Sequence, residues 1–418
     1  MVSFGGVNRW SQEQSSDVLA KVFCFIISPL LGLLVAIRRI NTKSSFVIFF
    51  LFAVFFGLSF TTVSGRDDEN KGDATQYRMR FEYMSDMTQN DLRDVFFVFQ
   101  SFQDERNRDI YVPIMTYLTS RITNNYHVFF ALLACVFAYF SLRSFKFFSE
   151  ELPGRKNIYV FILLYIFVFS NSIFNINGCR FWTAAWIAVY SIFQIFKNGN
   201  KRYYLLAAIT PLVHASYWFF LGILIIAQLF GKRIKFWKIA FFLSFIFSSL
   251  SMQLVVDLSD YLPSSLQFLV DRYTEGEHEL KTNLYQVISR LFGLGQTIVL
   301  TCIMYLFMKN ERRIMNNPKT TTLYSFLLVW MTICNFVMPI PSLGGRYIVL
   351  GMPLIAYIWY LNFESCLKYR ETLVFYIAVS LLPIYELIVC YLQLSVPISF
   401  YVTSPLYQFY KYIILGVV

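Results

Sequence analysis

Apolar stretches of about twenty residues recur along this chain, and a helix of that length spans the roughly 30 Å hydrocarbon core of a bilayer. The composition agrees, because 57% of the 418 residues are hydrophobic and only 15% are charged, whereas soluble chains are near half apolar and a quarter charged. Residues 1–17 are polar and the first apolar run is too long for a cleavable signal peptide. The sequence therefore predicts an all-α polytopic integral membrane protein, with residues 1–418 as one membrane domain.

Short basic clusters between the apolar stretches account for the net charge of +11, so this charge indicates topology rather than nucleic-acid binding. They are Arg38 to Lys43, Arg143 to Lys156, Lys197 to Arg202, Lys232 to Lys238, Lys309 to Lys319, and Lys368 with Arg370. By the positive-inside rule they face the cytoplasm. Residues 18–37 are then expected to run inward from an outer N-terminus. Spans at 44–63, 126–148, 157–174, 179–196, 234–256, 286–308, 321–338, 347–362 and 372–394 follow, for about ten to twelve transmembrane or re-entrant helices in all.

Three segments do not fit simple alternation of spans. Residues 64–125 are expected outside the membrane, with one or two amphipathic helices along its surface. Residues 257–285 form an acidic outer loop. The apolar run 203–230 lies between two basic clusters and is interrupted by Pro211, His214 and Ser216, which favours a re-entrant helical hairpin with His214 near its outer tip. One kinked helix is the alternative, and the sequence does not place the tail 395–418.

Two arginines are predicted to begin helices at the outer face. Arg180 follows Asn175, Asn177 and Gly178, which are suited to helix capping and a tight turn. Arg346 follows Pro339 to Gly345 in a similar arrangement. A guanidinium near a helix N-terminus suits an anion such as a phosphate, so one diphosphate could bridge both. Each arginine could instead reach to the interface or pair with an outer acid.

Three further titratable residues are candidates for chemistry. His214 lies inside an apolar run, where a neutral imidazole could accept a proton near pH 7; alternatively, the backbone at the helix break satisfies it. Asp73 could act as a base or orient a sugar hydroxyl, or it could cap the following helix. Glu386, in the span 372–394, is better explained by a hydrogen bond to a neighbouring helix. The chain has no nucleotide-binding motif, and its seven cysteines lack metal-ligand spacing.

Taken in order, these residues resemble the EpsG-like branch of the Wzy-type polysaccharide repeat-unit polymerases. The matching positions are Arg66, Gly72-Asp73 and Tyr77; then Asn177, Gly178 and Arg180; then His214 with Ser216; and late in the chain Gly345, Arg346 and Tyr347. The chain departs from the pattern where the charged insert Asp67 to Lys71 lengthens the spacing between Arg66 and Asp73, and where Cys179 precedes the arginine.

The resemblance implies a GT-C-like helical fold in the bacterial cytoplasmic membrane, with an active site facing the periplasm or cell exterior. It implies glycosyl transfer without metal, nucleotide or other cofactor, from a growing glycan on undecaprenyl diphosphate to the distal sugar of a lipid-linked repeat unit. His214 and Asp73 would be catalytic, and Arg180, Arg346 and Arg66 would bind the diphosphate. Tyr77, Asn177, Ser216 and Tyr347 would contact substrate. Membrane lipid and a chain-length regulator protein are the further partners.

Two other functions use similar residues. A lipid-linked oligosaccharide flippase also needs cations for the diphosphate, but its charges should run through the depth of many spans, and these spans carry few. An O-antigen-ligase-type glycosyltransferase would also use arginine and histidine side chains to act on a lipid-diphosphate donor, so the sequence separates it poorly from a polymerase. The identity of the sugars and their linkage depend on the shape of the pocket.

Overall fold

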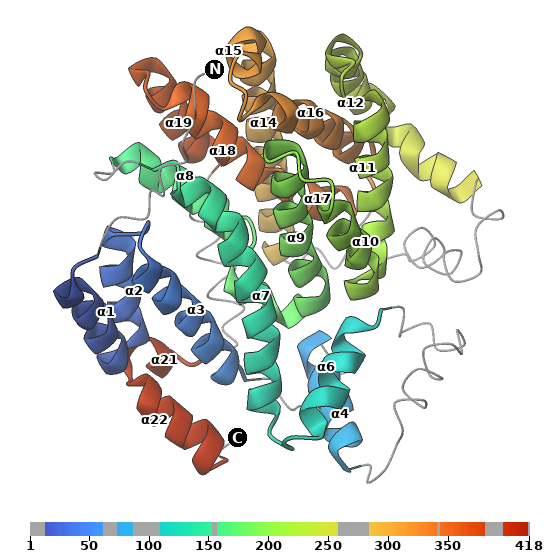
Figure 1. Cartoon of the computed structure of the whole chain (residues 1–418). Helices are drawn as coiled ribbons and strands as arrows, with labels where there is room; N and C mark the ends of the chain where they lie inside the picture. Colours follow the sequence, from blue (N-terminus) through green and yellow to red (C-terminus); the bar gives the residue numbers. More distant parts are fainter. Residues whose placement is uncertain are drawn as a thin grey trace.

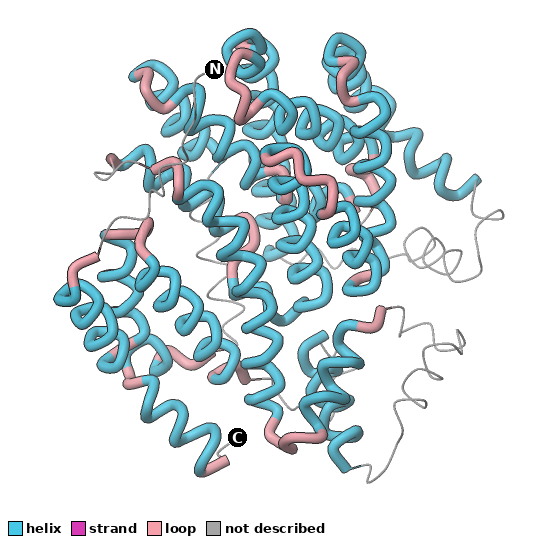
Figure 2. Tube along the Cα trace, in the orientation of Figure 1, coloured by secondary structure: helices cyan, strands magenta, loops and turns pink. Residues whose placement is uncertain are grey.

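The structure is a computed structural model, and it describes residues 13–61, 73–86, 109–152, 157–257, 284–340, 343–380 and 396–416. It is 81% helical, and no strand occurs among the described residues (Figures 1 and 2). Within them, three apolar stretches are long enough to cross a bilayer, Tyr126–Ser149, Ile158–Lys197 and Ile234–Ser251, and shorter apolar helices accompany them. The predicted all-α membrane protein is confirmed.

The helices of the N-terminal half are α1 (Ser15–Ile27), α2 (Pro29–Arg38), α3 (Lys43–Leu58), α4 (Asp73–Asp86), α6 (Tyr111–Ser120), α7 (Tyr126–Ser149), α8 (Ile158–Phe169), the 3₁₀ turn η1 (Ile173–Gly178) and α9 (Cys179–Ile192) with its π-helical end η2 (Phe193–Lys197). Then follow α10 (Tyr203–Val213), η3 (Ala215–Tyr217), α11 (Trp218–Phe230), α12 (Ile234–Asp257), α14 (Leu284–Lys309) and α15 (Glu311–Met315). The last are α16 (Thr321–Phe336), α17 (Gly344–Val349), α18 (Met352–Phe363), α19 (Leu367–Ser380), α21 (Ser399–Val402), α22 (Pro405–Phe409) and η5 (Tyr410–Ile414).

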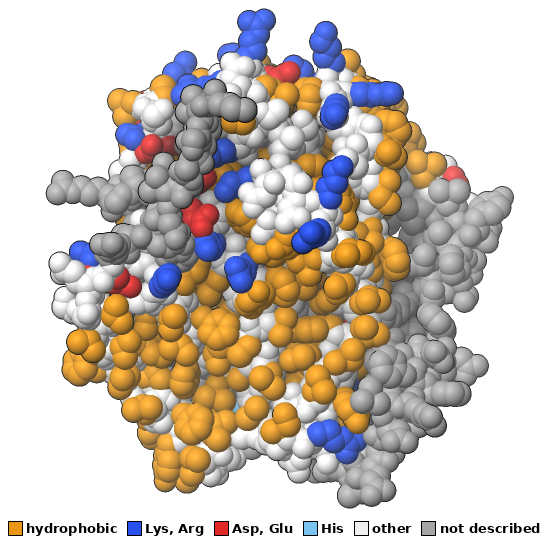
Figure 3. All heavy atoms as spheres, in the orientation of Figure 1, with side chains coloured by type: hydrophobic (Ala, Val, Ile, Leu, Met, Phe, Trp, Pro, Cys, Tyr) orange, Lys and Arg blue, Asp and Glu red, His pale blue; other side chains and the backbone are white. Residues whose placement is uncertain are grey.

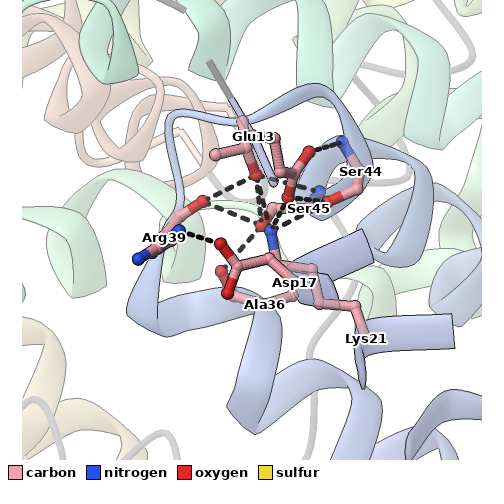
Figure 4. Close-up of polar contacts among 8 residues, drawn as sticks. Glu13, Asp17, Lys21, Ala36, Arg39, Ser44 and Ser45 are labelled. Carbon is pink, nitrogen blue, oxygen red and sulfur yellow. Dashed lines mark hydrogen bonds and ion pairs between the residues drawn. The ribbon is translucent and has the colours of Figure 1, made fainter. Parts of the chain in front are cut away.

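The first apolar run forms two helices rather than the single expected span. The chain breaks at Ser28, whose extended backbone precedes Pro29, and α2 folds back against α1. Asp17 at the start of α1 consequently forms an ion pair with Arg39 just after α2 (Figure 4). A continuous helix would separate these residues by about 30 Å at 1.5 Å per residue. The N-terminal end of α1 therefore lies on the same face as the first basic cluster, and the single span expected over residues 18–37 is wrong.

A buried lysine holds this N-terminal hairpin together. Lys21 is 2% exposed, and its ammonium group donates to Thr42 Oγ1 at 2.7 Å, to Ser44 Oγ at 2.8 Å and to the carboxylate of Glu13 (Figure 4). Three acceptors match the three donors of an ammonium group. Burial of this charge is thus compensated, and α1, α2 and the start of α3 are joined at one end.

The apolar run 203–230 also folds as a hairpin. Pro211 lies near the end of α10, and the backbone of His214 is extended. Tyr204 at the start of α10 donates a hydrogen bond of 2.6 Å to Gln228 near the end of α11, so the two helices return to one face. At 1.5 Å per residue each helix is shorter than about 20 Å and does not span the bilayer. His214 therefore lies at the tip of a helical hairpin.

Aromatic side chains form much of the core around α7, α9 and α16. Trp186, Trp330 and Tyr347 are almost completely buried there, and α9 packs against α7 and α10 (Figure 1). On the face shown in Figure 3, hydrophobic side chains cover most of the lower surface, whereas Lys and Arg gather mainly toward the top. This separation of charge from apolar surface fits a protein with its basic ends on one side of a bilayer.

The described part of the tail, 396–416, contacts residues that flank α3 and α7. Gln408 is buried and accepts a hydrogen bond of 2.9 Å from Ser59, which directly follows α3. The Asn125 amide, just before α7, donates to the backbone oxygen of Tyr412 at 2.6 Å. These contacts place the segment against the C-terminal end of α3 and the N-terminal end of α7.

Candidate functional site

Arg180 lies in the first turn of α9, where a 3₁₀ turn leads directly into the helix. Gly178 is the N-cap residue and no side chain caps the helix. Asn177 Oδ1 instead accepts from the Gly178 N–H at 2.8 Å, and the Asn175 amide donates to Asn171. The expectation that Asn175 or Asn177 caps this helix is wrong, because both lie in the 3₁₀ turn that leads into α9 and their side chains bond elsewhere.

The Arg180 guanidinium connects α9 to the outer segment. Its Nε donates to Tyr77 Oη on α4 at 2.7 Å, and its Nη1 donates to Asp109 Oδ2 at 3.1 Å. Nη2 lies 4.0 Å from Asp73 Oδ2. The Arg180 side chain is 22% exposed. Two contacts thus fix the plane of the guanidinium, and the Nη2 edge has only the loose Asp73 contact among the described residues.

The two close partners of Arg180 are themselves buried. Asp109 is 4% exposed, and burial raises the pKa of its carboxyl to about 6, although the charge of Arg180 acts in the opposite direction. Burial likewise raises the pKa of Tyr77, so its phenol stays protonated. Asp73 differs, because its side chain is 56% exposed. One buried acid positions Arg180, and one exposed acid stands beside it.

His214, Ser216 and Tyr347 form a hydrogen-bonded chain. His214 Nδ1 lies 2.8 Å from Ser216 Oγ, which in turn lies 2.9 Å from Tyr347 Oη. The backbone N–H of Ser216 also donates to Nδ1, at 3.3 Å. His214 and Ser216 are partly exposed, whereas Tyr347 is completely buried. The hydroxyl groups proposed from sequence to contact substrate therefore contact one another and the imidazole.

The ring of Phe181 joins these groups. It meets His214 edge-on with ring centroids 5.3 Å apart, and it meets Tyr347 in the same way at 5.4 Å. The guanidinium of Arg346 lies over its face, 5.5 Å from the centroid. Arg346 is exposed on the short helix α17. Phe181 directly follows Arg180 at the start of α9. The ring contacts of Phe181 therefore place His214 and Arg346 near this end of the helix.

A backbone hydrogen bond also joins the segment of Asp109 to the hairpin tip. The N–H of Ile110 donates to the carbonyl oxygen of Leu212 at 2.9 Å, two residues before His214. Asp109, which accepts from Arg180, is therefore next to a residue that is hydrogen-bonded to the end of α10, just before His214.

Sequence reasoning missed Asp109 and Phe181. Asp109 ends a strongly charged stretch, 104–109, in which nothing marks one acid, and Phe181 is one of 46 phenylalanines. Of the expected residues, Arg66 and Glu386 lie outside the described part of the chain. Within that part, no group of three or more His, Cys, Asp or Glu is placed to hold a metal ion.

Comparison with known proteins gives one match. The model of the EpsG family matches residues 51–413, which include every candidate residue named above. No curated protein and no solved structure matches the chain.

Proposed function

This chain belongs to the EpsG family, which supports a polysaccharide polymerase-type role, and we propose that it extends a glycan carried on a lipid diphosphate. The donor is a growing glycan on undecaprenyl diphosphate, and the acceptor is the distal sugar of a lipid-linked repeat unit. The observation that carries this proposal is that the Phe181 ring contacts both His214 and Arg346, while Arg180 is the preceding residue in the first turn of α9. The fold is proposed to be GT-C-like.

The reaction needs charge stabilisation and a proton acceptor. The acceptor hydroxyl oxygen forms a bond to the anomeric carbon of the donor sugar, and the bond from that carbon to the phosphate oxygen breaks. The electron pair of the broken bond goes to the departing lipid diphosphate, and the hydroxyl proton goes to a base. Cations that bind the diphosphate more tightly as its charge develops lower the barrier.

Two arginines suit the diphosphate. Arg180 is held by Tyr77 and Asp109, so its planar donor group is already oriented, and Nη2 is the edge left for a phosphate oxygen. Arg346 is exposed, and the Phe181 ring supports its guanidinium. An anion placed between these groups gains from both charges. His214 and Asp73 are the two candidates for the base.

The proposed orientation puts the site toward the outer side of the cytoplasmic membrane. The six basic clusters mark the cytoplasmic side by the positive-inside rule. Arg180 lies at the opposite end of α9 from Lys197, and α4 packs near it. A flippase would need charged residues through the depth of the membrane to move the headgroup across it. The candidate residues Arg180, His214 and Arg346 are instead proposed to lie near one face.

The test is polymerisation in proteoliposomes of the purified protein. A synthetic lipid-diphosphate-linked repeat unit should be converted into a ladder of longer lipid-linked products, and the Arg180→Lys variant should make little. Transbilayer movement of the substrate without any ladder would contradict the proposal and favour a flippase. Transfer only to a lipid A core acceptor would favour a ligase.

A further inference from the structure

The environment of one ring nitrogen of His214 limits what this residue can do. A peptide N–H can only donate, and the N–H of Ser216 points at Nδ1. Nδ1 therefore serves as an acceptor, because a proton on it would meet the proton of that N–H. The Ser216 hydroxyl, 2.8 Å away, then donates to Nδ1 as well, and it accepts from Tyr347 Oη at 2.9 Å.

The remaining ring nitrogen must then carry the proton. Burial disfavours the charged form of this imidazole, and the nearby cations Arg180 and Arg346 act in the same direction, so the neutral ring is favoured over imidazolium. A neutral ring with an unprotonated Nδ1 carries its proton on Nε2. No partner of Nε2 occurs among the described residues, and His214 is partly exposed. Nε2–H is thus available as a donor.

We infer that His214 acts as a hydrogen-bond donor through Nε2–H to an oxygen of the lipid diphosphate, and that Ser216 and Tyr347 are positioning residues which fix this tautomer. The inference rests on the proposed function for the identity of the ligand. The flanking guanidinium groups make an anionic oxygen the favoured acceptor of this hydrogen bond. The proton of the attacking hydroxyl then goes to Asp73, the exposed carboxylate 4.0 Å from Arg180.

Nitrogen NMR tests the tautomer without any activity. The chain has three histidines, so isotope-labelled full-length protein in nanodiscs gives few imidazole signals, and His214→Gln identifies the signal of His214. We expect an unprotonated Nδ1 and a protonated Nε2. Ser216→Ala should shift the Nδ1 signal and lower turnover about tenfold, and Ser216→Thr, which keeps the hydroxyl, should restore both. A signal showing protonated Nδ1 in the wild-type protein overturns the inference.

A pair of isosteric variants tests the donor role. The amide nitrogen of glutamine reaches the position of Nε2, whereas that of asparagine reaches only the position of Nδ1, and neither amide accepts a proton near pH 7. His214→Gln should retain polymerisation within about tenfold of wild type, and His214→Asn should lose about 100-fold, as expected for loss of one donor to a developing anion. Equal, near-complete loss in both variants would show that His214 is the base and overturn the inference.

The two experiments separate the inference from the proposed function. If wild-type protein with the expected tautomer makes no polymer, the polymerase proposal fails. Binding of the lipid diphosphate is then compared among the wild type, His214→Gln and His214→Asn. Retained binding in His214→Gln and lost binding in His214→Asn would support the donor role. Equal binding by all three proteins would overturn it.

Discussion

Replacing Asp109 by asparagine should stabilise the fold at neutral pH and weaken the activity. The pKa of the buried carboxyl rises from its ordinary value of 3.8 to about 6 on folding. The folded state thus binds more protons than the unfolded state between pH 4 and 6, so stability falls as pH rises through this window. Above pH 6 the ionised carboxylate costs at most about 3 kcal/mol of folding free energy, at 1.36 kcal/mol per pKa unit.

The activity should change in the opposite direction. The bond from Arg180 Nη1 to Asp109 joins two charged groups, and such bonds contribute about 1.5–3 kcal/mol, against about 1 kcal/mol for a neutral acceptor. Asparagine keeps a neutral acceptor, so positioning of Arg180 weakens by roughly 1.4 kcal/mol, which is about tenfold. Protonation of Asp109 below about pH 6 should have the same effect in the wild type, and this acid limb should be absent from the variant.

The assay compares kcat/KM for polymerisation and the midpoint of thermal unfolding at pH 5 and pH 7.5. Glu82→Gln is the matched control, because Glu82 is an acid on α4 that pairs with Arg78 one turn earlier in the same helix, and its loss should change the rate less than twofold. An Asp109→Asn protein with wild-type kcat/KM, or one destabilised at pH 7.5, would refute the reasoning from burial and charge.

Three other changes test separate parts of the structure. Arg180→Lys cannot contact Tyr77 and Asp109 in the same planar geometry, so polymerisation should fall about 100-fold with normal expression; full activity would remove Arg180 from the site. Lys21→Met leaves the Glu13 carboxylate without its cation and should cost about 3 kcal/mol in unfolding experiments, part of which Glu13→Gln should recover. A reporter that fluoresces only in the cytoplasm should be active when fused to the N-terminus, and a dark, stably expressed fusion would contradict the hairpin topology.

The sequence alone determined the fold class. Twenty-residue apolar lengths require helices, because hydrocarbon satisfies no backbone polar group, and the basic clusters predict how those helices are oriented. The sequence also indicated the break at His214, since a histidine and a proline interrupt an apolar run between two basic clusters. It failed at Ser28, because hydropathy does not register a turn inside an apolar stretch, and the structure shows the turn in the extended backbone of Ser28 and the pairing of Asp17 with Arg39.

Tertiary structure decided how the candidate residues act on one another. Local spacing identified Arg180, His214 and Arg346, but it could not show that Asp109, 71 residues before Arg180, holds the guanidinium. Nor could it show that Ser216 and Tyr347, 131 residues apart, form one hydrogen-bonded chain with the imidazole of His214. These contacts depend on packing between helices that are distant in the sequence. The hydrogen-bond partners and the burial of each side chain are therefore set only by the folded structure.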